Sequence, residues 1–160
     1  MGNFYTDVIE KDSRFDTTDR IADMSLLEPS TRQRVEAIIA EAKSQGIELM
    51  IFETYRSQAR QLQLFNQGAT QLQTVGVHHY GLACDIVKCI NGEPSWKGDF
   101  SFLGTLAKKH GLIWGGDWGS PSAKHTFFDY DHVQRCSVGD QQALFNGGWY
   151  PDQNYDPCAD

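Results

Sequence analysis

The sequence is poor in long apolar runs, in basic residues and in paired cysteines. No stretch approaches the roughly 20 consecutive apolar residues of a membrane-spanning helix, so we expect no membrane span. The net charge of −7 and the scattered lysines and arginines argue against nucleic acid as a partner, because phosphate binding needs clustered positive charge. The first residues lack the apolar stretch of a secretory signal, so we expect synthesis in the cytoplasm without a signal peptide.

The four cysteines form no Cys-x-x-Cys pair: Cys84, Cys89, Cys136 and Cys158. Four cysteines allow three disulfide connectivities, and their spacing does not select one of them. We expect Cys84 to be a small, buried apolar residue, whereas the other three would pair only in an oxidising compartment. The disulfide state and the oligomeric state stay open at this stage.

The composition is that of one globular domain. Apolar residues make up 40% of the chain and charged residues 22%, and a domain of this size buries roughly 68–70% of its unfolded surface. A metal ion is therefore not needed for folding, which favours a catalytic role for any metal site. We divide the chain into an N-terminal arm (1–29), a core (30–136) and a C-terminal helix and tail of the same domain (137–160).

Helices and strands are expected to alternate without a βαβ rhythm. The apolar spacing predicts helices over residues 30–46, 57–67, 99–110 and about 139–145, the first with a capping box at Ser30–Gln33. Strands are predicted at 47–54, 81–87 and 127–134. Residues 1–29 are polar and are expected to be irregular. This order predicts an α+β fold with a small, mostly antiparallel sheet packed with helices.

The most informative segment runs from His78 to Asp85, which are seven positions apart. If residues 81–87 form a strand, Gly81, Ala83 and Asp85 share one face and Cys84 lies on the other. The aspartate would then have small neighbours that leave room for an ion, and the Cys84 face would belong to the core.

A second segment, Asp129 to His132, adds a histidine with a carboxylate three residues before it. Two imidazoles and one carboxylate are a catalytic zinc set, because three protein ligands leave a fourth position for water. We expect one Zn²⁺ per chain, bound by His78, Asp85 and His132. Asp129 is then the candidate general base. Two alternatives remain: His79 in place of His78, and Asp131 in place of Asp129.

Four segments resemble those of one enzyme family and occur in its order. They are H-x-x-G-x-A-x-D at 78–85, D-x-x-H at 129–132, Thr-Tyr-Arg-Ser at 54–57 and Trp-Gly-Gly-Asp-Trp at 114–118. Together they resemble the zinc D-alanyl-D-alanine carboxypeptidase and L-alanyl-D-glutamate endopeptidase family, which includes many phage endolysins. The resemblance covers roughly residues 30–135 and implies a hedgehog/DD-peptidase-like fold.

The resemblance also implies roles for individual residues. The three zinc ligands are the same as those expected above, and Asp129 matches the catalytic carboxylate. Arg56 matches the arginine that holds the substrate and stabilises the developing oxyanion. Asp117 and Trp118 match residues that line the substrate cleft.

Three departures from the family pattern bear on substrate preference more than on metal binding. Gly76 stands where a serine is usual two residues before the first ligand, which puts one hydrogen bond to that ligand in question. Gln134 stands where a glutamate is common, and residues 118–129 form a longer stretch than usual.

The resemblance implies a zinc metallopeptidase that hydrolyses peptidoglycan stem peptides, with the L-Ala–D-Glu endopeptidase as first choice. A D-Ala–D-Ala carboxypeptidase is the alternative of the same class. A non-catalytic zinc-containing cell-wall binding module is the alternative of another class, and Asp129 and Arg56 argue against it. We expect action on peptidoglycan in the periplasm, after lysis as an endolysin or after secretion as an effector. Only an effector would have an immunity protein as a partner.

Overall fold

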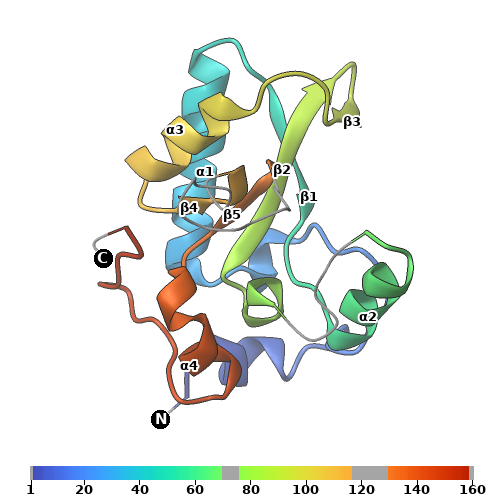
Figure 1. The fold of residues 1–160 in the computed structure, drawn as a ribbon, viewed down its shortest axis with the longest axis vertical. Coiled ribbons are helices and arrows are strands. Elements are labelled where there is room, and N and C mark those ends of the chain that lie inside the picture. The colour runs from blue at the N-terminus through green and yellow to red at the C-terminus, as the bar shows by residue number, and fades with distance from the viewer. Residues whose placement is uncertain (1, 70–75, 117–129, 159–160) are drawn as a thin grey trace.

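The computed structural model describes residues 2–69, 76–116 and 130–158, and it confirms the expected α+β class. Figure 1 shows a small sheet with two helices, α1 (Pro29–Ser44) and α3 (Ser101–Lys109), beside it. Two further helices, α2 (Gln58–Asn66) and α4 (Gln141–Phe145), lie toward the other end of the molecule. None of the described helices combines the length and the apolar character needed to cross a membrane.

The sheet contains five strands in the described part of the chain: β1 (Leu49–Glu53), β2 (Ala83–Ile90), β3 (Glu93–Ser95), β4 (Ile113–Trp114) and β5 (His132–Gln134). The order is β1-β2-β5-β4, with β3 also paired to β2, and each of these pairs is antiparallel. Strand β2 is therefore central. Its register places Asp85 opposite His132 on one side and opposite Glu53 on the other.

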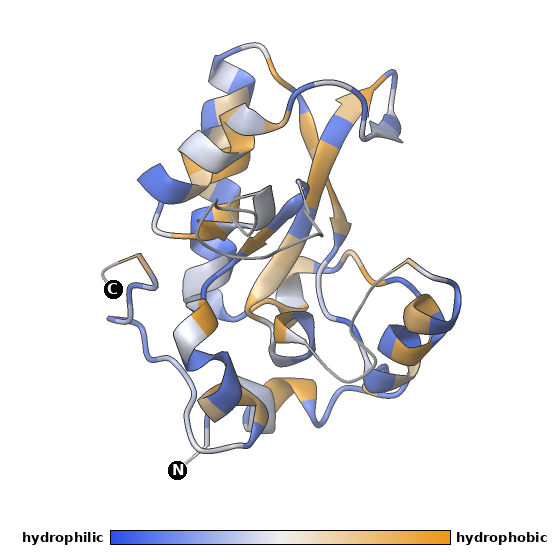
Figure 2. Cartoon of the chain, viewed as in Figure 1, coloured by the Kyte–Doolittle hydropathy of each residue, from blue (hydrophilic) through white to orange (hydrophobic). Residues whose placement is uncertain are grey.

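The main core lies between the sheet and the helices α1 and α3. It includes Val35 and Ile38 from α1, Leu103 from α3, and Cys84 and Ile86 from β2. Figure 2 shows the hydrophobic residues along β1 and β2 and on the helices beside them. The expectation that the Cys84 face of the strand belongs to the core is thus confirmed. This packing leaves the opposite face of β2, which carries Asp85, for the site.

The segment before α1 is more regular than the polar sequence suggested. It contains a π-helix (Tyr5–Ile9) and a 3-10 helix (Met24–Leu26). A second cluster of buried residues joins this segment to the loop after β1: Ile9, Ile21, Leu26 and Tyr55. The expectation of an irregular segment was wrong, because a few apolar side chains spaced along a polar stretch find partners elsewhere in the fold.

Helix α1 begins two residues earlier than a capping box at Ser30 would allow. Its N-cap is Glu28, whose carboxylate accepts hydrogen bonds from the backbone N–H groups of Ser30 and Thr31. Pro29 occupies the first helical turn, where a missing N–H costs nothing. The capping-box prediction was wrong because a buried glutamate can supply both acceptors from one side chain.

All four cysteines are free thiols in the structure. Cys84 and Cys136 are buried, Cys89 is partly buried and Cys158 is exposed. Burial raises the pKa of the Cys136 thiol to about 12, and it raises the pKa of Cys84 well above its ordinary value. These two thiols are therefore protonated at neutral pH and poorly reactive.

Candidate metal centre

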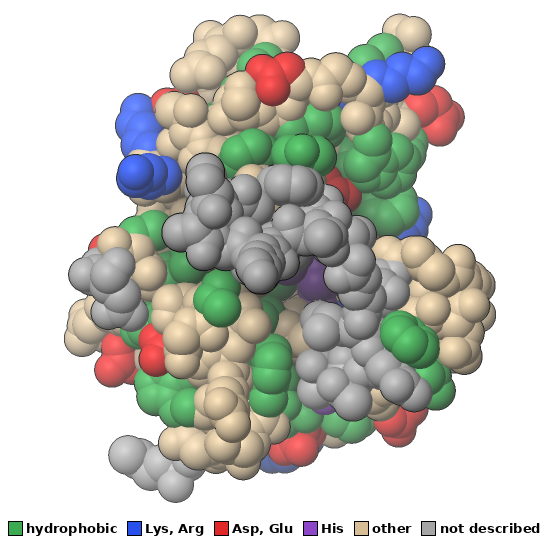
Figure 3. Space-filling view, viewed as in Figure 1, with side chains coloured by type: hydrophobic (Ala, Val, Ile, Leu, Met, Phe, Trp, Pro, Cys, Tyr) green, Lys and Arg blue, Asp and Glu red, His purple; other side chains and the backbone are tan. Residues whose placement is uncertain are grey.

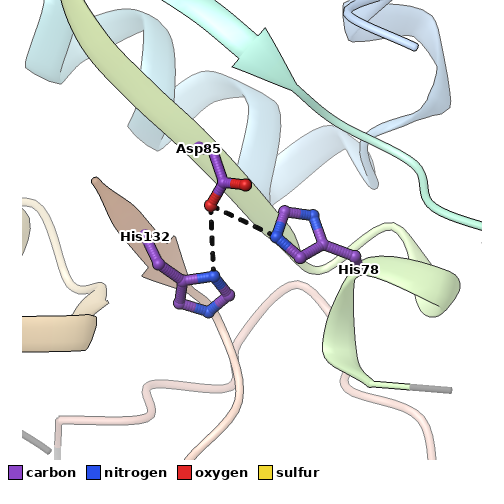
Figure 4. A group of neighbouring side chains, drawn as sticks. All are labelled: His78, Asp85 and His132. Atoms are coloured by element: carbon purple, nitrogen blue, oxygen red, sulfur yellow. Dashed lines mark ion pairs between the residues drawn. The ribbon is translucent and has the colours of Figure 1, made fainter. Parts of the chain in front are cut away.

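Two neighbouring elements and one that is distant in the sequence bring together His78, Asp85 and His132 (Figure 4). His78 lies in a 3-10 helix (Val77–Tyr80), Asp85 in β2 and His132 in β5. One ligand atom from each residue lies within 4.8 Å of the others. Asp85 Oδ1 is 3.3 Å from His78 Nε2 and 3.4 Å from His132 Nδ1. All three side chains are buried.

A left-handed turn at Gly81 joins the 3-10 helix to β2 and so sets the spacing between His78 and Asp85. Its φ is +74°, and a Cβ at this position would lie 2.8 Å from Ile9 Cδ1 and 3.0 Å from the Leu26 carbonyl oxygen. Only glycine fits here without strain or displacement. The strand begins at Ala83, so the expectation that Gly81 shares a strand face with Asp85 was wrong.

One hydrogen bond, which the ring donates to a group outside the cluster, fixes the orientation of His78. Its Nδ1 lies 2.7 Å from the Thr54 carbonyl oxygen. Because a carbonyl can only accept, Nδ1 carries the hydrogen in the neutral ring, and the lone pair of Nε2 faces Asp85. The serine that the family usually places at position 76 is therefore not the only means of orienting this ring.

Gln134 orients His132 in the same way. Its side-chain N–H₂ group donates to the Cys136 carbonyl at 2.6 Å and to Gln141 Oε1 at 2.8 Å. These two bonds leave its Oε1 as the acceptor for His132 Nε2, which lies 2.7 Å away. The lone pair of His132 Nδ1 then faces Asp85.

The three residues fit a metal ion. His78 Nε2 and Asp85 Oδ1 are buried and have no hydrogen-bond partner among the described residues. Burying such atoms without a partner is costly, and a cation would satisfy them together. Two imidazole nitrogens and one carboxylate oxygen are ligand types that zinc accepts, with a further position left open.

Asp85 is held in the ionised form that a metal ligand requires. Burial by itself would raise the pKa of the Asp85 carboxyl, but His78, His132 and the nearby Arg56 hold it well below its ordinary value. Its second oxygen, Oδ2, accepts from Arg56 Nη2 at 3.2 Å.

Arg56 comes from the loop between β1 and α2, and it lies beside the cluster. Its Nη2 also donates to Glu53 Oε1 at 2.9 Å, and its Nη1 donates to Gln61 Oε1 at 3.3 Å. The side chain is 13% exposed and the Glu53 side chain 1%. The guanidinium is therefore held in a defined orientation next to Asp85, unlike a solvated surface arginine.

His79 points away from the cluster. Its Nε2 is 2.8 Å from the Tyr5 hydroxyl, and its ring packs among Tyr5, Phe15 and Tyr55. Burial lowers the pKa of His79. The metal-competent group in the described part of the chain contains His78, so the structure does not support the alternative ligand.

The other predicted residues lie partly outside the described residues. Asp129, Asp117 and Trp118 belong to the stretch 117–129 and stay sequence-based assignments. Asp131, the alternative base, accepts a hydrogen bond from Trp96 Nε1 at 2.9 Å and is not part of the three-residue group.

Two residues that support the cluster were not predicted: Thr54 and Gln134. Gln134 had been noted only as a departure from a pattern. Its position two residues after His132 on a strand places both side chains on the same face, so a period of two could have indicated the contact. Thr54 acts through its backbone carbonyl, which no sequence pattern reveals.

Comparison with known proteins agrees with this geometry. A family model described as D-alanyl-D-alanine carboxypeptidase matches residues 70–135. The peptidoglycan L-alanyl-D-glutamate endopeptidase CwlK of Bacillus subtilis is 30% identical over 127 residues, which cover 68% of this chain and 72% of that protein. The L-alanyl-D-glutamate peptidase of Listeria phage A118 is 29% identical over 144 residues, and the match covers 88% of this chain but 49% of the phage protein.

Solved structures share the fold at lower identity. The L-Ala D-Glu endopeptidase ChiX of Serratia marcescens superposes with a TM-score of 0.54 at 23% identity, covering 74% of this chain and 90% of that one. A D,D-pentapeptidase, VanY, from a VanB-type vancomycin resistance cassette was solved in complex with Zn(II). It gives a TM-score of 0.55 at 14% identity, with 75% and 78% of the two chains covered. At these identities the likeness supports the fold alone.

Proposed function

This chain belongs to the D-alanyl-D-alanine carboxypeptidase family of metallopeptidases, and from that premise we propose that it is a zinc-dependent L-alanyl-D-glutamate endopeptidase of peptidoglycan. The two curated relatives described above both carry this activity in their names. The observation that carries the proposal is the convergence of two imidazoles and one carboxylate whose inward-facing atoms are buried and need a cation.

The chain's own residues would each perform one task in the reaction. His78, Asp85 and His132 would hold zinc, which supplies Lewis acidity at the cluster when bound. Arg56, already oriented by Glu53, would donate hydrogen bonds to the substrate carbonyl oxygen as it gains negative charge. Asp129 would take the proton of the attacking water and return it to the leaving amine.

The experiment is digestion of purified peptidoglycan by the zinc-loaded protein, with identification of the new termini by mass spectrometry. We expect new amino-terminal D-Glu residues. Released D-Ala would instead support the carboxypeptidase, which the description of the family model favours. The absence of any new terminus would support a binding module. Elemental analysis should give one zinc per chain, and His132→Ala should lose it.

The general base is tested by Asp129→Asn, with Asp131→Asn as the matched control. We expect Asp129→Asn to keep its zinc and its melting temperature but to lose about 10²–10⁴-fold in hydrolysis, because an amide cannot accept the proton. Asp131→Asn should retain most activity. The reverse result would show that the two carboxylates have been exchanged in our assignment.

The biological setting is part of the same proposal. We place the activity on cell-wall peptidoglycan, which is the substrate named for the curated relative CwlK. An endolysin would reach it after lysis and an effector after secretion. If this protein co-purified with an immunity protein, it would be identified as an effector.

A further inference from the structure

Trp96 is a large aromatic side chain that stays half-exposed at the edge of the sheet. Six large apolar side chains are exposed in the described part of the chain: Val8, Leu62, Ile90, Trp96, Tyr130 and Val138. Of these, only Trp96 and Tyr130 are aromatic, and Tyr130 lies two residues before His132. The exposed aromatic surface of the described chain therefore includes residues close to the metal-competent cluster.

The indole of Trp96 is held in one orientation. Its Nε1 donates to Asp131 Oδ2 at 2.9 Å. Its ring meets Phe52 edge-to-face, with 4.8 Å between the ring centroids and 78° between their planes. Arg20 covers the Phe52 ring at 4.4 Å. A tryptophan that is 49% exposed yet fixed by a hydrogen bond and an aromatic contact is preorganised for binding a ligand.

Both residues that hold Trp96 are chain neighbours of the site. Asp131 precedes His132, and Phe52 precedes Glu53, whose partner across the sheet is Asp85. One residue along a strand and one strand spacing across the sheet place the backbone of the residues that hold Trp96 within roughly 8 Å of the cluster. Figure 3 shows hydrophobic side chains gathered near β2 and β3, and a histidine is visible lower on the same face.

That distance matches the substrate of the proposed endopeptidase. In peptidoglycan, the L-Ala of the stem peptide is joined through a lactyl group to an amino sugar. The sugar thus begins about two residue lengths, or roughly 7 Å, from the L-Ala–D-Glu bond. The C–H-rich face of a pyranose ring is apolar and weakly positive, so it stacks on the negative face of an aromatic ring.

We propose that Trp96, held by Phe52 and Asp131, is the stacking surface for the amino sugar that carries the stem peptide. The inference rests on the proposed function, and it adds a glycan-binding subsite to it. Trp96 is accordingly a specificity residue: it favours stem peptides still attached to the glycan over free peptides.

The test compares two substrates that differ only in the sugar. One is a muropeptide that carries the disaccharide, and the other is the same stem peptide with its L-Ala N-acetylated, so that both keep an amide at this position. The parental protein should have the higher kcat/KM on the muropeptide. Trp96→Ala should lower kcat/KM for the muropeptide about tenfold, as expected for the loss of one aromatic stack. Trp96→Ala should leave kcat/KM for the acetylated peptide unchanged.

Two variants serve as controls. Trp96→Phe keeps an aromatic face but loses the Nε1 donor. It should retain most of the preference for the muropeptide over the acetylated peptide. Val138→Ala removes an exposed apolar side chain that is not among the contacts of Trp96. It should change kcat/KM for neither substrate. Melting temperature and zinc content, measured for each variant, report on folding and on the cluster.

Each other outcome is decisive. Equal losses on both substrates, or no loss on either, would overturn the subsite. If the parental protein cleaves neither substrate, the proposed function fails. Calorimetric titration of the muropeptide and of the acetylated peptide then tests the subsite separately. If the subsite exists, the muropeptide binds more tightly than the acetylated peptide, and Trp96→Ala abolishes this difference in affinity.

Discussion

Arg56 shows how much the surroundings of one residue determine its chemistry. The guanidinium is nearly buried and contacts two carboxylates, Glu53 and Asp85, each of which has other partners. Glu53 is also paired with Arg60 at 2.7 Å. This arrangement keeps a positive charge beside the cluster. It suits a group that must stabilise negative charge developing on a substrate.

Replacing Arg56 should therefore affect catalysis more than folding. Arg56→Lys keeps the charge but loses the planar fork, so its turnover should already fall. Arg56→Ala should lose about 10²–10³-fold in kcat/KM on stem peptides. It should also lower the free energy of unfolding by about 1–3 kcal/mol, because buried acceptors lose a donor.

Steady-state kinetics and thermal unfolding check this prediction, with Arg32→Ala as the control. Arg32 is an exposed arginine paired with Glu36 at 3.6 Å, and such pairs contribute little to stability. If both Arg56 variants kept the turnover of the parental protein, Arg56 would have no role in the mechanism.

At the scale of elements, β5 connects the cluster to the C-terminal part of the chain. The strand carries His132 and Gln134 on one face, and Gln134 contacts Gln141 at the start of α4. The orientation of His132 therefore depends on a helix that follows the strand. A neutral amide fits here because it accepts from the imidazole and donates to two other groups at once.

Gln134→Leu should weaken metal binding because it removes the acceptor for His132 Nε2. Zinc affinity, measured by competition with a chelator, should fall about 10–100-fold. Gln134→Glu keeps this acceptor, so its affinity should fall less. Its carboxylate would face the Cys136 carbonyl and Gln141 Oε1 without a donor, however, which should lower the melting temperature.

Gln142→Leu is the matched control, because Gln142 is exposed on the same helix. It should change neither the zinc affinity nor the melting temperature. Parental zinc affinity in Gln134→Leu would show that Gln134 does not position His132.

At the scale of the whole molecule, the side chain of Arg135 holds the C-terminal tail to the start of α1. It is fully buried and donates to Glu28 Oε1 at 3.0 Å, to the Tyr155 carbonyl oxygen at 3.0 Å and to the Asp152 carbonyl oxygen. Burial lowers the pKa of Arg135, and the nearby Glu28 opposes that shift. One side chain next to β5 thus joins two segments, the start of α1 and the C-terminal tail.

Arg135→Met should lower the free energy of unfolding by roughly 3–5 kcal/mol, because it leaves the Glu28 carboxylate buried without its cation. Chemical denaturation measures this change. In a double-mutant cycle, Glu28→Gln together with Arg135→Met should cost less than the sum of the single changes.

Arg14→Met provides the comparison at the surface. Arg14 also contacts two carboxylates, Asp12 and Asp23, but its side chain is 38% exposed. Its loss should cost no more than about 1 kcal/mol. Equal costs for Arg14→Met and Arg135→Met would argue against Arg135 as the residue that joins these segments.

The sequence by itself determined the α+β class, most of the helices and strands, and the residues that could form a metal site. These features depend on local patterns: apolar spacing identifies elements, and the spacing of His78 and Asp85 around a glycine indicates that they can meet. Element ends were less well determined, as the N-cap of α1 shows, because a cap depends on which side chain reaches the first N–H groups.

Only the tertiary structure decided which distant groups support these residues. Glu28 and Arg135 are 107 positions apart, and the Thr54 carbonyl lies 24 positions from His78. The strand order β1-β2-β5-β4 brings Asp85 between Glu53 and His132. Such contacts depend on how elements pack rather than on the residues beside them in the chain. Periodicity and motifs therefore indicate the ligands, whereas packing determines their orientation.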